Sequence, residues 1–140
     1  MTKLRLFSSA AICLLVLSSC DGQDEAARVA AATPTVSVTA EEMIKDYWGD
    51  MGAANRKYKD RIVVVEGFIE SIERNDDMLS INLDADAAES TEIGSPSVSC
   101  DFANVSDMPD VKIGDRIKIK GLCEGKLSTM VMMGYCVKSD

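Results

Sequence analysis

The sequence predicts a mainly β domain, a small closed barrel of five strands preceded by an N-terminal α-helix. Residues 61–72 form the longest run of strand-favouring residues in the chain, rich in branched side chains, and such runs are typical of strands. At least four shorter strand signals follow this run, and helical periodicity precedes it. We therefore expect residues 61–72 to form the first strand of the barrel.

The expected helix covers about residues 40–57. Thr39-Ala40-Glu41-Glu42 fits a capping box, in which the threonine hydroxyl and the glutamate each satisfy a free amide of the first turn. Apolar residues then recur at spacings of three and four. Tyr47 and Trp48 lie on this apolar stripe, where they either plug one end of the barrel or form an aromatic platform for a ligand.

The first three strands form a meander. Gly67 interrupts the run of residues 61–72 and marks a place where the strand can bulge or bend. Residues 74–77 have turn composition, and residues 79–83 alternate between apolar and polar side chains. Residues 98–102 provide the third strand, so the meander is complete before residue 104.

Two further strands complete the barrel. A short connector over residues 104–111 leads to a strand at residues 116–123, a turn at residues 124–126 and a last strand at residues 127–137. The methionines of the last strand are interpreted as adaptable core filler. The order of helix, three-strand meander, connector and hairpin is that of the OB-fold barrel.

A basic stripe lies on the fourth strand. Arg116, Lys118 and Lys120 alternate with the apolar residues and face the opposite side. One interpretation is an anion-binding surface. The other is that lysines on an exposed strand prevent pairing with further strands.

The N-terminus has the features of a secretory signal peptide. Lys3 and Arg5 precede a mostly apolar segment that is too short for a stable transmembrane span. The segment ends in Leu17-Ser18-Ser19-Cys20, which resembles the lipobox of bacterial lipoproteins. That resemblance implies removal of residues 1–19 and attachment of diacylglycerol to Cys20.

Three regions follow from this interpretation. Residues 1–19 are the removed signal peptide, residues 20–38 are the lipidated Cys20 with a flexible tether, and residues 39–138 are the folded domain. Fully extended, the tether would reach about 60 Å from the bilayer. We expect the protein in the bacterial cell envelope, on the periplasmic side of the inner or the outer membrane, with the lipid bilayer as a partner through Cys20.

Composition argues against several functional classes. Removal of residues 1–19 leaves 13 basic and 23 acidic side chains, a net charge of −10, which disfavours nucleic acid as a partner. The chain has no histidine, the commonest general base and zinc ligand. The acidic loop of residues 84–96 lacks the pattern of a calcium loop. We therefore expect no catalysis, no cofactor and no metal.

Three cysteines lie in expected strands of the mature domain. In an OB barrel the third and fifth strands are parallel neighbours, and Cys100 and Cys136 lie near their C-terminal ends, so we favour a Cys100–Cys136 disulfide. Cys123 is then left as a thiol. Three buried reduced thiols remain the alternative.

Several short motifs carry a family resemblance. They are Lys57-Tyr58-Lys59, Val65-Glu66-Gly67-Phe68-Ile69, Val98-Ser99-Cys100-Asp101-Phe102, Ile113-Gly114-Asp115, Lys120-Gly121-Leu122-Cys123 and Cys136. In this order they resemble the tRNA_anti-like family of OB-fold bacterial lipoproteins, over about residues 40–137. The resemblance implies an OB fold, and the family name implies binding of transfer RNA by distant fold analogy only.

The sequence thus predicts a membrane-anchored, exported OB-fold module that binds an unidentified protein or small ligand without catalysis. The alternative is binding of nucleic acid or another polyanion through Arg116, Lys118 and Lys120. An enzyme is the weakest hypothesis, because no nucleophile motif is present and the carboxylates lie in loops.

Overall fold

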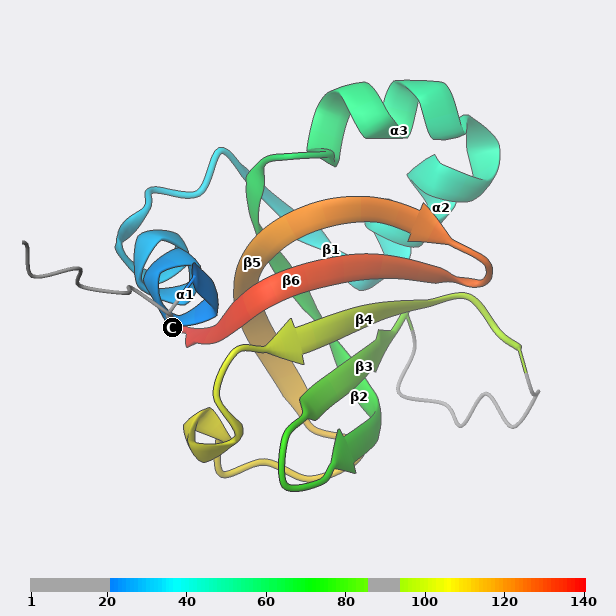
Figure 1. Cartoon of the computed structure of the whole chain (residues 1–140). Helices are drawn as coiled ribbons and strands as arrows, with labels where there is room; N and C mark the ends of the chain where they lie inside the picture. Colours follow the sequence, from blue (N-terminus) through cyan, green and yellow to red (C-terminus); the bar gives the residue numbers. More distant parts are fainter. Residues whose placement is uncertain (1–20, 86–93) are drawn as a thin grey trace, which may run out of the picture.

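The computed structural model describes residues 21–85 and 94–140 and shows a mainly β barrel with helices N-terminal to it (Figure 1). The helices are α1 (Asp21–Ala31), α2 (Ala40–Gly49), α3 (Met51–Tyr58) and the 3-10 helix η1 (Val105–Asp107). The strands are β1 (Val36–Thr39), β2 (Ile62–Arg74), β3 (Leu79–Asp84), β4 (Ser97–Phe102), β5 (Arg116–Leu127) and β6 (Met130–Ser139). The signal peptide, Cys20 and most of the acidic loop lie outside the described residues.

The barrel closes because β2 pairs with three other strands. Its first half pairs with β1, parallel, on one edge and with β5, antiparallel, on the other. Its second half pairs with β3, and the ring continues through β4 and β6 to β5. Strands β2 to β6 therefore form the five-stranded OB barrel that the sequence predicts, and β1 is an additional strand beside it.

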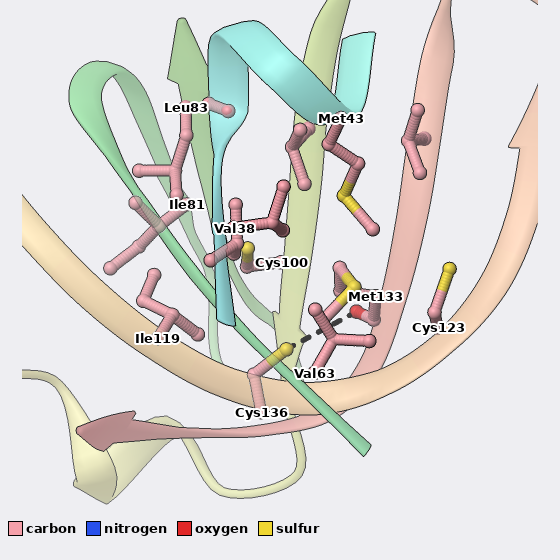
Figure 2. Close-up of a cluster of buried hydrophobic side chains, with 14 of the residues drawn as sticks. Val38, Met43, Val63, Ile81, Leu83, Cys100, Ile119, Cys123, Met133 and Cys136 are labelled. Atoms are coloured by element: carbon pink, nitrogen blue, oxygen red, sulfur yellow. Dashed lines mark hydrogen bonds between the residues drawn. The ribbon is translucent and has the colours of Figure 1, made fainter. Parts of the chain in front are cut away.

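The interior is filled by the inward-facing residues of every strand, some of which Figure 2 shows. Val63, Val65 and Ile119 are completely buried, as alternation predicts. The methionines are divided, since Met133 is buried in this core, whereas Met130 and Met132 are only partly buried. The methionine of β6 that lies in the core thus acts as filler, as expected.

Two tyrosines close one end of the barrel. Tyr47 of α2 and Tyr58 of α3 are buried, and their ring centroids lie 6.0 Å apart in a stacked arrangement. Trp48 is different, because it is 40% exposed and lies under the Lys126 Nζ, 4.2 Å from the ring centroid. Tyr47 therefore plugs the end of the barrel, as one of the two interpretations expects, whereas Trp48 does not.

The single helix expected over residues 40–57 is two helices. Asp50 between them has an extended backbone, with φ −149° and ψ 98°. Its carboxylate accepts a hydrogen bond from the Ala53 amide at 3.0 Å, which caps the start of α3. A good N-cap residue between two glycines therefore breaks the helix where the apolar spacing alone predicts continuity.

The segment expected to be a flexible tether is folded where the structure describes it. Residues 21–31 form α1, which packs against β5 and β6, and residues 36–39 form β1. In α1 only small apolar side chains are buried, Ala26 at 7% and Val29 at 0% exposure. The sequence offered few large apolar residues, but a helix needs only a narrow apolar stripe to dock on a sheet.

The last hairpin turns later than predicted. β5 continues to Leu127 and the turn lies at Ser128 and Thr129, with Ser128 at φ 56°. Gly125, which the sequence placed in the turn, lies within β5 at φ 102°, next to a shift in the pairing register. The glycine therefore marks an irregularity in the strand and not its end.

Gly67 does not produce a bulge in β2. It pairs in regular register with Ile117, and the register shift lies further on, between Ile69 and Ser71. A Cβ at Gly67 would meet the Ala40 Cβ at 2.8 Å and the Asp84 carbonyl at 3.1 Å. The glycine is required because the start of α2 lies directly against the strand.

Replacing Gly67 tests this close approach. Gly67→Ala should lower the free energy of unfolding by about 1–3 kcal/mol, because the new methyl group forces α2 away from β2. Gly49→Ala is the matched control, since nothing lies within 4 Å of a Cβ there. Thermal or denaturant unfolding measures both, and equal stability of the two variants would contradict the close contact.

Candidate binding site

A groove with a volume of about 520 Å³ lies on the outer face of the barrel, within the size range of small-ligand sites. We call it the Lys118 groove. Its lining residues are Pro34, Ser37, Val38, Thr39, Glu42, Val64, Glu66, Lys118, Ser139 and Asp140. They come from β1, β2, β5 and the C-terminal end of β6, together with the start of α2.

The strand register explains how these residues meet. Thr39 pairs with Glu66, Glu66 with Lys118, and Lys118 with Ser139. One row of side chains therefore crosses four neighbouring strands, a distance of about 14 Å at 4.8 Å per strand. Because Ile117 and Ile119 are buried in the barrel, the residue between them faces outward into the groove.

The three residues of the predicted basic stripe lie on one face of β5 but have different surroundings. Arg116 Nε lies 2.6 Å from Glu66 Oε1, and its guanidinium is 5.7 Å from the centre of the Phe68 ring. Lys120 Nζ donates to the Ala30 carbonyl of α1 and to the Ala32 carbonyl just after this helix. Lys118 has no ion pair or hydrogen bond within the described residues, so it is the member of the stripe that can meet an anion without losing a partner.

Lys120 holds the end of α1 on the barrel. Its Nζ lies 2.6 Å from the Ala30 carbonyl oxygen and 3.2 Å from that of Ala32. The last carbonyls of a helix lack partners within the helix and carry its negative dipole end. A lysine at this place donates hydrogen bonds to these carbonyls and also brings a positive charge to the negative end of the helix dipole. The sequence could not reveal this role, because α1 itself was not predicted.

The acidic wall of the groove is held by a network between α2 and α3. Lys57 Nζ lies 3.2 Å from Glu42 Oε1 and 2.9 Å from Asp46 Oδ2, and the Tyr58 hydroxyl donates to Asp46 at 2.6 Å. Hydrogen bonds from Lys57 and Tyr58 lower the pKa of Asp46. Burial and the hydrogen bond to Asp46 raise the pKa of Tyr58 to about 12. The Glu42 carboxylate is thus partly neutralised by Lys57.

The outer face of β3 and β4 has a different character. Ser80 and Ser99 share a hydrogen bond of 3.2 Å, and the Asn82 amide donates to the Ser71 hydroxyl at 2.9 Å. No aromatic or basic residue occurs in either strand at an outward position. Single-stranded nucleic acids are bound by aromatic platforms and positive charge, and this face supplies neither.

The three cysteines of the domain are buried free thiols in the structure. Cys136 fills the space beside Gly121 and donates to the Met133 carbonyl oxygen at 3.3 Å (Figure 2). Cys123 shares a contact of 3.6 Å with the Tyr47 hydroxyl. Burial raises the pKa of Cys123, which makes it a poor nucleophile.

The strand register narrows the possible disulfides. Cys100 and Cys123 both pair with Met133, from opposite sides, so they lie two strands apart, about 9.6 Å, too far for a disulfide. Cys100 lies close enough to Cys136 to raise its pKa, with burial as the larger cause. The Cys100–Cys136 disulfide therefore stays a prediction. These two cysteines lie closer together than Cys100 and Cys123.

Residues 21–85 and 94–140 contain neither a cluster of metal ligands nor a membrane-spanning helix. No group of three or more histidine, cysteine or acidic residues in these ranges is arranged to hold a metal ion. None of their helices has the length and apolar composition needed to cross a membrane.

The family assignment rests on nearly the whole chain, because the tRNA_anti-like family matches residues 4–137. The protein belongs to the tRNA_anti-like family. The resemblance inferred from the sequence motifs is thereby confirmed, and the barrel agrees with an OB-type domain.

No curated protein matches this tRNA_anti-like chain. Among solved structures, it is similar to a crystal structure described as an aspartyl-tRNA synthetase from Leishmania major Friedlin, with 10% identity and a TM-score of 0.44. The similarity covers 76% of this chain and 21% of the other. The tRNA_anti-like chain thus spans about a fifth of that protein's length.

The role of Lys120 can be tested by hydrogen exchange. Lys120→Gln should speed amide exchange in α1 about tenfold, because the lost charge-assisted hydrogen bonds stabilise docking by about 1–2 kcal/mol. Exchange in β2 should not change. Lys138→Gln is the control with the same change of charge at an exposed site. Equal exchange of α1 in the two variants would show that Lys120 does not hold the helix.

The disulfide prediction can be tested by alkylation. Mature protein isolated without reductant, unfolded and treated with iodoacetamide should gain one label, on Cys123, because Cys100 and Cys136 are bonded. Prior reduction should raise the number of labels on these residues to three, which serves as the control. Three labels without reduction would establish the alternative of three thiols.

Proposed function

We propose that the protein is an exported lipoprotein, anchored in a membrane of the bacterial cell envelope through acylated Cys20, whose OB domain binds a protein or small ligand without catalysis. The OB-fold domain and the tRNA_anti-like family are established above. The anchor is supported by the lipobox-like residues Leu17 to Cys20, which precede the described residues.

The Lys118 groove is the observation that carries the binding function. It combines a volume suited to a ligand, a cation without an ion pair in the described part of the chain, and several hydroxyl groups on one outer face. The groove lies on strands whose inward residues form the core, so its side chains are positioned by the rigid part of the molecule. Rigid strands are favourable supports for a binding site.

The position of α1 supports a location of the domain close to the membrane. This helix begins at Asp21, the residue after the proposed anchor, and docks on β5 and β6. Its 11 residues span about 16 Å as a helix, whereas the same 11 residues fully extended would span about 36 Å. With α1 docked, the barrel is therefore held near the lipid headgroups, and partners at the membrane surface are favoured.

Binding of nucleic acid or another polyanion has less support. Arg116 and Lys120 already have partners, and Glu42, Glu66 and Asp140 line the groove around Lys118. The net charge of the mature chain is −10 once the basic residues of the signal peptide are removed. A polyanion would meet repulsion on most approaches.

The anchor can be tested by fractionation. Cys20→Ser should move the protein from the membrane fraction to the soluble fraction and abolish labelling with a palmitate analogue, because acyl chains provide the main membrane affinity. The wild-type chain, released only by detergent, is the control. A wild-type protein that is soluble without detergent, or a variant that stays in the membrane fraction, would contradict the anchor.

A further inference from the structure

Lys118 is the one cation among the residues that line the groove, and it has no ion pair within the described residues. Glu66 beside it is already paired with Arg116 at 2.6 Å, and Glu42 on the wall is paired with Lys57 at 3.2 Å. Lys118 has no partner among the described residues. A ligand with one negative group can therefore form a charge-assisted hydrogen bond here without displacing a partner.

The acidic residues limit the charge of that ligand. Glu42, Glu66 and Asp140 all line the groove, and each would repel a second negative group close to Lys118. A single carboxylate fits this arrangement, whereas a chain of phosphates does not.

The rest of the groove offers hydrogen bonds and apolar contact in similar measure. Ser37, Thr39 and Ser139 supply hydroxyl groups, and Pro34 and Val64 supply apolar surface. The side chain of Val38 belongs to the core at 7% exposure, so the part of this residue that lines the groove is its backbone. Backbone groups beside hydroxyl groups suit a ligand that itself has amide groups.

The length of the groove gives the size of the ligand. From β1 across β2 to Lys118 is two strand spacings, about 9.6 Å, which an extended chain covers with about three residues. We propose that the Lys118 groove binds the free carboxyl end of a short extended peptide, with the terminal carboxylate on Lys118 and the preceding residues directed across Glu66 toward β1. This inference rests on the proposed binding function and names its site and ligand class.

Capture of a terminal carboxylate is an established way of binding peptides. Here β1 pairs only with β2 within the described sheet. The exposed side chains of Ser37 and Thr39 flank Val38 on this short strand. Peptide amides therefore meet hydroxyl and backbone acceptors at one end of the groove and the carboxylate meets a cation at the other.

The test is an NMR titration of the full chain in detergent micelles with N-acetyl-trialanine and with the same peptide as its C-terminal amide. The carboxylate form should shift the amides of Ser37, Thr39, Lys118 and Ser139 and leave those of β3 and β4 unchanged. The amide form should bind at least about tenfold more weakly, since a charge-assisted hydrogen bond is lost.

Two variants with the same change of charge complete the experiment. Lys118→Gln should weaken binding of the carboxylate form about tenfold, and Lys112→Gln, outside the groove, should not. Unchanged unfolding temperatures establish that both variants are folded. Equal binding of the two peptides, unaltered binding by Lys118→Gln, or no shifts in folded wild-type protein would overturn the proposal.

A single-stranded DNA oligomer serves as the competing probe. Shifts at Lys118 with DNA and none with the peptide would assign the groove to polyanions and overturn the peptide proposal. If the peptide does not bind, only the proposed ligand of the Lys118 groove is overturned. The lipid anchor and binding at another face of the barrel are tested by separate measurements, so the proposed function and the proposed peptide site can fail independently.

Discussion

The pairing of β2 with three other strands is the constraint on which the rest of the structure depends. Its first half holds β1 and β5, and its second half holds β3. β2 therefore contributes to both sides of the barrel, and closure of the barrel buries the core. The same pairing aligns Thr39, Glu66, Lys118 and Ser139 in one row across the outer face. The candidate site is thus a consequence of barrel closure and not a separate addition to it.

The second consequence concerns α1. Val29 is buried against the barrel, and Lys120 donates to the last carbonyls of the helix. These contacts replace a long tether by a docked helix and use one cation of the basic stripe for structure. The residues of the stripe on β5 therefore differ: Arg116 pairs with Glu66, Lys120 holds α1, and Lys118 is the residue that we propose meets a ligand. Three basic residues at alternate positions of one strand therefore have three different surroundings in the fold.

The sequence predicted what depends on local alternation and missed what depends on distant partners. Strands β2 to β5 and the OB barrel follow from apolar residues at every second position. The break at Asp50 was missed, because apolar spacing does not show that a carboxylate caps the next helix. The docking of α1 was missed, because its buried stripe consists of small residues. The sequence could not show which of the three basic residues lacks an ion pair or hydrogen bond within the described residues, because the partners of Arg116 and Lys120 come from β2 and α1.

Site-specific photocrosslinking in living cells tests the central claim most directly, namely that the face formed by β1, β2, β5 and β6 is the binding face. A photoreactive residue would replace Ser37, in the groove, or Asp101, on the outer side of β4. We expect crosslinked adducts from position 37 of the anchored protein and none from position 101. Adducts from position 101 alone would place binding on β3 and β4 and contradict it.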